Sequence, residues 1–546
     1  MAELQARLAF LETQPTTPNQ IHELRKMRID LNCWLDKEDK MWRQRARKNW
    51  FQGGDRNTKF FHAKASDRQS KNHIDGIFYG NGVWHEDEAE IVGIFVDYYT
   101  GLFSSSSPVD FEEILHAIEP KVSRERNADL SREFHEGEVH KALKQMYPLK
   151  ASGPDGMSPL FYQHFWSTCG CVLCNTVLAF LNNGISPPNF NQTHVVLIPK
   201  VKEPKHVTDF RPISLCNVIY KIASKTIANR FKRILQSIIS DSQSAFVHGR
   251  LIIDNVLVVF ETMHHISKKK GGKVGDMALK LDMSKAYDRV EWVCLEKIME
   301  KLGFVDKWRS LVMKCVTSVN YAIKVNGRPL GCITPTRGIR QGDPLSPYLF
   351  LLCAEGLSSL ITTSVANGDL KGISVCRGGP FLSHLFFADD SLIFCRASLE
   401  DCDELQRVLE VYERASGQQL NRAKTSLFFS KNTPRGIQGA IQSRFGAQVI
   451  KQHEKYLGLP SLVGKNKRNT FNDIKEKLGK KLAGWKEKLL SKASKEILIK
   501  AVALAMPTYT MSCFKIPDSL CDDLTSMIRN FWWGQKSEER KIPWVS

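Results

Sequence analysis

The chain has 546 residues, which is too long for one small domain and long enough to bury an extensive core. Hydrophobic residues make up 42% and charged residues 25%, a balance that excludes wholesale disorder, a collagen-like repeat and a coiled-coil rod. The formal net charge of +19 indicates a polyanionic partner, because each Lys or Arg placed on a phosphate releases condensed counterions.

The positive charge is concentrated in two segments. Residues 40–75 carry ten basic and three acidic side chains, and residues 464–500 carry twelve and four. In the first segment, aromatic side chains that can stack on bases alternate with cations: Trp42, Arg43, Arg45, Arg47, Lys48, Trp50, Phe51, Arg56, Lys59, Phe60 and Phe61. The alternative is that both segments are amphipathic helices with solvated charged faces and aromatic residues in the core. Residues 1–120 are predicted to be a helical, basic extension and linker.

Targeting segments are not evident in the sequence. No run reaches the roughly 18 apolar residues of a membrane span, and the first residues lack the apolar stretch of a signal peptide. We therefore expect an intracellular, soluble protein without a membrane partner. Further along, the apolar run from Val195 to Ile198 predicts a strand, Lys200 and Arg211 follow it, and residues 219–239 have helical periodicity.

The first segment with candidate chemistry is a strand from Met277 to Asp282. Alternation places Ala278, Lys280 and Asp282 on one face, with Asp282 at the carboxyl end of the strand. Ser284 is predicted to cap a helix over residues 285–299, so this junction places a carboxylate beside exposed backbone N–H groups.

The second segment is a polar glycine loop over residues 338–344. It contains Gln341 and Gly342, and we expect Asp343 to cap the following helix with Pro344 at its first position. The helix is predicted to continue to about residue 366 and to stop at Gly368. A glycine loop at a helix start can approach a phosphate or a base pair closely, although this signal is weak when taken alone.

The third segment, residues 384–395, predicts two apolar strands joined by a tight turn that contains Asp389 and Asp390. Adjacent aspartates in a turn are common for local reasons, since Asp side chains bond to their own backbone. Together with Asp282, however, they form a site of hard oxygen ligands that suits two Mg²⁺ ions, which can clamp an in-line phosphoryl displacement. The three carboxylates, together with the net positive charge of the chain, predict phosphoryl transfer on nucleic acid.

A series of landmarks supports this interpretation. In chain order they are Arg211-Pro-Ile-Ser-Leu215, Gln243-Ser-Ala-Phe246 with Gly249-Arg250 and Asp254-Asn255, Leu281-Asp-Met-Ser-Lys-Ala-Tyr-Asp288, Arg340-Gln-Gly-Asp-Pro-Leu-Ser-Pro347, Phe387-Ala-Asp-Asp390, Leu420-Asn-Arg-Ala-Lys-Thr-Ser426 and Tyr456-Leu-Gly-Leu459. They resemble the reverse transcriptases of non-LTR (LINE-type) retrotransposons, particularly those of plants. The resemblance covers about residues 40–546, including an N-terminal stretch at 53–63, with a polymerase core at about 194–461.

The resemblance implies roles for individual residues. Asp282 and Asp389 would hold two Mg²⁺ ions, Asp390 would complete the acidic cluster, and Asp288 would organise the turn. Residues implied to contact the nucleotide or the template and primer are Lys200 and Arg211 at the triphosphate, Lys424 near the pyrophosphate, Gln341 and Gly342, and Tyr287, which would exclude a ribose 2′-OH.

The resemblance also implies the fold and the partners. We expect an α+β right-hand polymerase with fingers at 121–275, a palm at 276–430 whose antiparallel sheet is ferredoxin-like, and a helical thumb from 431 to 546 that runs into the start of the C-terminal region. The partners would be an RNA template, a DNA primer, target DNA and deoxynucleoside triphosphates, and the family acts in the nucleus. The chain is expected to be a fragment that lacks the family's endonuclease.

Two other functions are compatible with the same right-hand polymerase fold. An RNA-dependent RNA polymerase is disfavoured by Tyr287, because that class prefers a smaller polar residue there. A domesticated RNA-binding protein is disfavoured by the three intact carboxylates, since a binding module has no need to keep mutually repelling charges together.

Overall fold

The computed structural model describes residues 2–13, 18–46, 58–80, 82–376, 378–450, 455–464, 467–486 and 490–534. The chain divides into two units, and each is described by itself. Unit 1 comprises residues 1–102, 134–223 and 318–335, and unit 2 comprises residues 103–133, 224–317 and 336–546. The side chains from Trp42 to Phe61 on which the stacking hypothesis depends lie outside the described residues.

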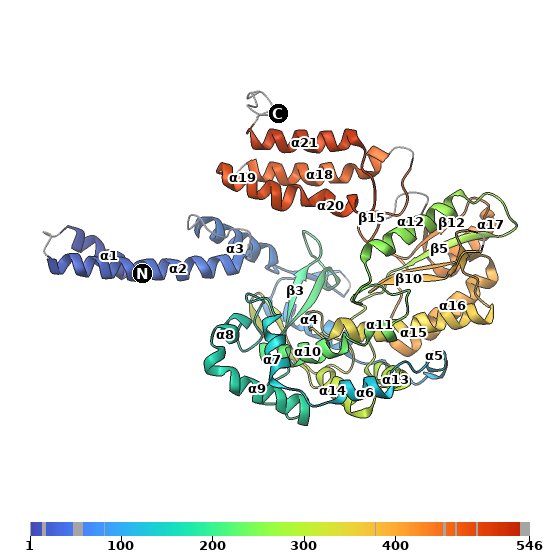
Figure 1. Cartoon of the computed structure of the whole chain (residues 1–546), viewed down its shortest axis with the longest axis horizontal. Coiled ribbons are helices and arrows are strands. Elements are labelled where there is room, and N and C mark those ends of the chain that lie inside the picture. Colours follow the sequence, from blue (N-terminus) through green and yellow to red (C-terminus); the bar gives the residue numbers. More distant parts are fainter. Residues whose placement is uncertain are drawn as a thin grey trace. The chain divides into compact units, whose positions relative to one another are not determined.

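Unit 1 contains helices and a sheet to which β3 belongs (Figure 1). This sheet has four strands in the order β4-β3-β6-β7. Strand β3 pairs antiparallel with β4 and parallel with β6, and β6 pairs antiparallel with β7. The strand that the sequence predicts at Val195 is therefore confirmed as part of β3. The elements are α1 (Ala2–Glu12), α2 (Pro18–Ala46), α3 (Thr58–Asn72), β1 (Ile77–Tyr79), β2 (Val83–His85), α4 (Glu88–Phe103), α7 (Glu136–Lys144), α8 (Pro159–His164), α9 (Trp166–Asn183), β3 (Gln192–Pro199), η1 (Val207–Asp209), β4 (Phe210–Cys216), β6 (Asn320–Val325) and β7 (Arg328–Ile333).

Unit 2 contains a five-stranded sheet with the order β10-β11-β5-β12-β13, in which only the β12–β13 pair is parallel. Its elements up to β11 are α5 (Glu112–Ala117), α6 (Arg124–Ser131), α11 (Leu235–Ile238), α12 (Ile252–Lys268), β5 (Gly275–Leu281), α13 (Trp292–Lys301), α14 (Asp306–Thr317), α15 (Ser346–Asn367), β8 (Ile373–Ser374), β9 (Phe381–Leu382), β10 (His384–Phe387) and β11 (Asp390–Ala397). Helix α10 (Val218–Phe231) begins in unit 1 and ends in unit 2, and with α11 it confirms most of the predicted helix at 219–239.

The remaining elements of unit 2 are α16 (Leu399–Ser416), β12 (Ser426–Phe429), α17 (Arg435–Phe445), β13 (Gln448–Val449), β14 (Lys455–Tyr456), β15 (Leu459–Pro460), α18 (Lys467–Lys486), α19 (Lys492–Leu498), the π-helical turn η2 (Ile499–Ala503), α20 (Ala505–Met511) and α21 (Asp518–Trp532). The last helices share an apolar core that includes Phe471, Leu478, Leu520 and Phe531. The mixture of helix and sheet is compatible with the predicted α+β class, whereas the boundaries of fingers, palm and thumb stay predictions.

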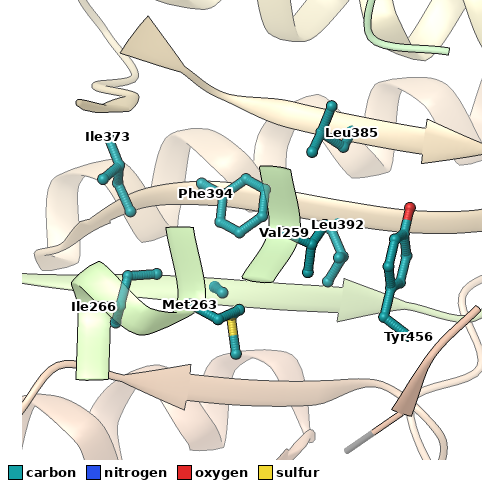
Figure 2. Packing of buried hydrophobic residues seen from close by; sticks show 9 residues of the cluster. Val259, Met263, Ile266, Ile373, Leu385, Leu392, Phe394 and Tyr456 are labelled. Atoms are coloured by element: carbon teal, nitrogen blue, oxygen red, sulfur yellow. The ribbon is translucent and has the colours of Figure 1, made fainter. Parts of the chain in front are cut away.

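The core beside the sheet explains why these strands form. Val259, Met263 and Ile266 on α12 pack against Leu392 and Phe394 of β11, as Figure 2 shows. Leu385, Ile373, Ala278 and Tyr456 complete the cluster, and Phe394 is fully buried. Helix α15 is the one described helix that is long and apolar enough to cross a membrane, and 72% of that stretch is buried inside the structure, as in the core helix of a globular domain.

Two of the predicted helix starts are wrong. After Asp282 the chain forms turns over residues 284–289, and α13 begins only at Trp292. The backbone there is bonded to other segments: Ser284 N–H donates to the Gln419 carbonyl (2.7 Å), and the Ala286 carbonyl accepts from Gln418 Nε2 (2.8 Å). Lys285 also has a left-handed φ of +56°, which a right-handed helix does not contain, so Ser284 caps no helix and Tyr287 lies in a turn.

The second correction concerns Asp343, which is not the cap of α15. That helix begins at Ser346, although it ends as predicted at Gly368, whose φ is +84°. The Asp343 carboxylate is buried and accepts hydrogen bonds from Ser224 Oγ and from the Leu345 N–H (2.9 Å), and it pairs with Arg340 (2.9 Å). The Asp343 carboxylate thus stabilises the glycine loop and does not cap the helix.

We predict that Phe394→Ala lowers the free energy of unfolding by about 3–5 kcal/mol, because the lost ring leaves a cavity between α12 and the sheet. Phe381→Ala is the matched control, since Phe381 is 75% exposed and its loss should change that free energy by less than about 0.5 kcal/mol. Urea denaturation of both variants measures the difference. Equal values for the two would contradict this description of the core.

Candidate active site at the acidic turn

The acidic turn joins β10 to β11. Phe387 pairs with Asp390, so only Ala388 and Asp389 lie between the paired residues. Ala388 has a φ of +55°, a left-handed conformation that two-residue hairpin turns require. Asp389 is exposed and Asp390 is half-buried. The predicted hairpin is confirmed, and Asp390 is the first residue of its second strand.

The pairing of β11 with β5 brings the third carboxylate to the same end of the sheet. Ser391 pairs with Leu281, so the next positions, Asp390 and Asp282, follow the last pair of this ladder. Burial raises the pKa of Asp390, and the negative charges of Asp389 and Asp282 raise it further, while Lys280 lowers it. The raised pKa of Asp390 thus has burial as its first cause and the negative charges of the other two carboxylates as a further one.

The acidic cluster of Asp282, Asp389 and Asp390 offers carboxylate oxygens to a cation. Carboxylate oxygens are the ligands that Mg²⁺ prefers, and the charges of Asp389 and Asp282 both act on Asp390. Among the described residues, no three His, Cys, Asp or Glu side chains converge closely enough to enclose an ion by themselves. The donor types therefore fit a hard cation that keeps water and substrate oxygens as further ligands.

Lys424 lies beside Asp282. Its Nζ is 3.9 Å from Asp282 Oδ2, and both side chains are partly exposed. The Asp282 carbonyl accepts from the Asn421 N–H (2.8 Å), which ties the segment that leads to Lys424 to the end of β5. The structure thus brings together two residues that the sequence analysis assigned to one site.

Tyr287 also lies close to the acidic turn. Its half-buried ring stacks on Phe350 with the ring centroids 5.0 Å apart and an interplanar angle of 9°. Burial raises the pKa of Tyr287, and the charge of Asp389 raises it further. The Tyr287 carbonyl accepts from the Ile339 N–H (2.8 Å), so the glycine loop holds the backbone that carries this ring.

The glycine loop supplies Gln341 and Gly342. Gln341 Nε2 donates to Asp288 Oδ1 (3.1 Å), and Asp288 is buried. Gly342 is exposed and has a φ of +113°, a value that a residue with a Cβ rarely adopts. Asp288 therefore connects the turn after Asp282 to the glycine loop.

Lys200 and Arg211 belong to unit 1, at neighbouring ends of β3 and β4, where Ile198 pairs with Arg211. Both side chains are exposed, and Lys200 Nζ donates to the Thr208 carbonyl (2.8 Å). Their predicted place at the triphosphate stays a prediction.

Sequence reasoning missed a buried polar network behind the turn. His384, at the start of β10, is in hydrogen-bond contact through Nε2 with Ser242 (2.9 Å) and Ser358 (2.8 Å), and through Nδ1 with Ser383 (2.9 Å). Burial lowers the pKa of His384 to about 4, so the imidazole is neutral at physiological pH. The available signal was the polar His384 in an otherwise apolar strand.

Residues 198–461 match the family of reverse transcriptases (RNA-dependent DNA polymerases). The chain is 26% identical over 507 residues, 90% of its length, to an uncharacterized 149 kDa protein of transposon TX1 from Xenopus laevis, of which it covers 37%. It is 26% identical over 269 residues, 48% of its length, to a Pol polyprotein of the type-1 retrotransposable element R2 from Popillia japonica, of which it covers 35%.

A shorter similarity involves a plant protein. The chain is 55% identical over 67 residues, 12% of its length, to an uncharacterized mitochondrial protein of Arabidopsis thaliana, of which it covers 55%. The chain therefore spans between about a third and about half the length of these relatives.

We predict that His384 makes stability depend on pH. Its folded pKa of about 4 lies below the ordinary value of 6.5, so below pH 6.5 the unfolded chain binds a proton that the folded chain does not. Stability is therefore lost as the pH falls, by about 2 kcal/mol between about pH 7 and pH 4.5. Urea denaturation at both pH values should show this loss in the parent and not in His384→Gln.

The comparison with His384→Gln isolates the imidazole. The pKa of Asp390 is raised, so its contribution to stability changes with pH in the direction opposite to that of His384. This contribution is the same in the parent and in His384→Gln, so it cancels in the comparison. The same pH dependence in parent and variant would contradict a buried neutral His384.

Proposed function

Residues 198–461 form a reverse transcriptase domain of the non-LTR retrotransposon type, and from this premise we propose that the chain adds deoxynucleotides to a primer 3′-OH on an RNA template. The observation that carries the proposal is the pairing of β5 with β11, which brings Asp282 to the end of the sheet where Asp389 and Asp390 form the turn. An acidic cluster at that position suits phosphoryl transfer, since its carboxylates can hold cations that bind the reacting oxygens.

Asp282, Asp389 and Asp390 would hold two Mg²⁺ ions. When bound, the ions would lower the pKa of the primer hydroxyl and stabilise negative charge on the transferred phosphoryl group. The chain's own contribution is to place three carboxylates at one end of the sheet, where the charges of Asp389 and Asp282 add to the burial that raises the pKa of Asp390. Lys424 beside Asp282 would receive the pyrophosphate, and Lys200 and Arg211 would contact the triphosphate.

Tyr287 would select the sugar. Its ring is fixed from one side by Phe350 and lies near Asp389, so a nucleotide held at the acidic turn would have its sugar against this ring. A 2′-OH would then clash with the ring, whereas a deoxyribose would fit. Gln341, held by Asp288, and Gly342 would line the position of the base pair.

The wider arrangement follows from the domain. We propose fingers at about 121–275, a palm with a ferredoxin-like sheet at 276–430, and a helical thumb from about 431 in which α18 and α21 share a core. The basic segments at 40–75 and 464–500 would contact RNA, the DNA primer and target DNA through phosphates. The similarity to the Arabidopsis thaliana protein supports a plant origin, and copying into target DNA would take place in the nucleus.

We predict that Asp282→Ala and Asp389→Ala each reduce primer extension by at least about 100-fold. Binding of the template and primer should stay nearly intact, because the carboxylates contact cations rather than nucleic-acid phosphates. The assay is extension of oligo(dT) on poly(rA) with Mg²⁺, and Asp369→Ala removes an exposed carboxylate in unit 2 as a control. Extension by either variant within about tenfold of the parent would refute the proposed active site.

Tyr287→Val should raise the incorporation of ribonucleotides relative to deoxynucleotides, with a loss of discrimination of about 1–3 kcal/mol. Tyr287→Phe is the matched control: it keeps the ring and removes only the hydroxyl, so discrimination should remain. Competition between the two nucleotide types during extension measures the ratio. A Tyr287→Val enzyme that extends well and still excludes ribonucleotides would show that another residue contacts the sugar.

A further inference from the structure

A short segment that precedes α12 runs along β10, behind the acidic turn. The Phe386 N–H donates to the Ser242 carbonyl (2.7 Å), and the Ser244 N–H donates to the Phe386 carbonyl (3.1 Å). Gln243, between these two serines, pairs with Phe386 in the parallel sense and is only 2% exposed. The segment thus places a buried carboxamide beside Phe386, three residues before Asp389.

The Gln243 carboxamide contacts the turn directly. Its Oε1 accepts from the Ala388 N–H (3.0 Å) and from the Ala245 N–H (3.0 Å). Because both partners are backbone donors, the atom between them must be the oxygen and not the amide nitrogen. Sequence reasoning used Gln243 only as a landmark and gave it no role.

The amide nitrogen of the same carboxamide indicates that Gln243 is present for its oxygen. Gln243 Nε2 is buried and has no hydrogen-bond partner within the described part of the chain. A buried donor without a partner is unfavourable, and an apolar side chain of the same size would avoid it. Space filling therefore does not account for a glutamine at this position, whereas an acceptor for the Ala388 N–H does.

Ala388 is the residue that needs such an acceptor. Its left-handed conformation, φ +55°, is uncommon for a residue with a Cβ and persists where the surroundings hold it. Ala388 immediately precedes Asp389, so its backbone sets the direction in which the Asp389 carboxylate leaves the turn. A bond to the Ala388 N–H therefore acts on the carboxylate without contacting it.

Gln243 is itself held firmly. Its carbonyl accepts from an Arg250 guanidinium nitrogen (2.5 Å), which also bonds to the Ser240 carbonyl (2.5 Å). Asn255 joins the same segment to the strand, since Asn255 Oδ1 accepts from Ser244 Oγ (2.5 Å) and Asn255 Nδ2 donates to the Phe386 carbonyl (3.1 Å). A fixed backbone at Gln243 gives its side chain a fixed position against the turn.

We infer that Gln243 is a positioning residue, which holds the Ala388 backbone through Oε1 and thereby fixes the Asp389 carboxylate for cation and nucleotide binding. The catalytic part of this inference rests on the proposed function, and the structural part does not. Gln243 touches no substrate, so its loss should reduce the turnover number and the affinity for Mg²⁺ more than the affinity for the template and primer.

The test compares two substitutions of similar size. Gln243→Met removes the acceptor and keeps the volume, whereas Gln243→Glu keeps an acceptor oxygen. Gln163→Met is a matched control in unit 1, because Gln163 Nε2 also makes two bonds to the backbone, to the carbonyls of Leu143 and Met146 (both 2.9 Å). Hydrogen exchange at the Ala388 amide reports on the bond itself, and primer extension over a Mg²⁺ titration reports on catalysis.

In Gln243→Met we expect the Ala388 amide to exchange at least about tenfold faster. We also expect kcat to fall by about 10–100-fold, because misplacement of a catalytic group by 1 Å is enough for such a loss. The Mg²⁺ concentration for half-maximal rate should rise severalfold, and the Kd for the template and primer should stay within about twofold. Gln243→Glu should keep the exchange protection, and Gln163→Met should change none of these quantities.

Several results would overturn the inference. Unchanged exchange at Ala388 in Gln243→Met would refute the bond, and an unchanged Mg²⁺ requirement with only a lower melting temperature would show that Gln243 is merely structural. If Gln243→Met does not fold, loss of protection in a folded Gln243→Glu would equally refute the inference. If the parent itself fails to extend primers, the proposed function fails, and the exchange measurements still decide whether Gln243 holds the turn.

Discussion

The antiparallel pairing of β5 with β11 is the interaction on which the candidate site depends. The ladder ends with Ser391 paired to Leu281, so the two chain segments leave the sheet at the same place and carry Asp390 and Asp282 with them. A shift by one residue would move every side chain of β11 to the other face. The apolar contacts of Leu392 and Phe394 with α12 prevent that shift, since the register that buries them also brings the carboxylates together.

The acidic turn is an unfavourable structure that its surroundings stabilise. The carboxylates repel one another, and Ala388 has a left-handed backbone. Behind the turn, neutral groups hold the strand in place: the His384 imidazole bonds with serines, and the Gln243 oxygen accepts from the turn. Neutral donors and acceptors can fix the backbone there without cancelling the negative charge that a cation site needs.

Much of the site could be predicted because its signals are local. Alternation gave the strand before Asp282, and two apolar runs around Asp389 gave the hairpin. The landmarks indicated a resemblance to reverse transcriptases, and residues 198–461 match that family. The helix expected after Ser284 does not form, because Lys285 has a left-handed φ of +56° and contacts with Gln418 and Gln419, distant in sequence, hold this segment as a turn. The contact of Gln243 with Ala388 could not be predicted for the same reason, since the two residues are 145 positions apart.

We infer that the segments at Asp282 and at Asp389–Asp390 form one cation site. Backbone cleavage by Fe²⁺, bound in place of Mg²⁺ and activated with ascorbate and peroxide, tests it directly, because the radicals cut only close to the ion. If both segments bind one ion, we expect cuts within a few residues of both segments, and the loss of both sets of cuts in Asp282→Ala. Cuts at one segment alone, or cuts at Asp389–Asp390 that persist in Asp282→Ala, would contradict a shared site.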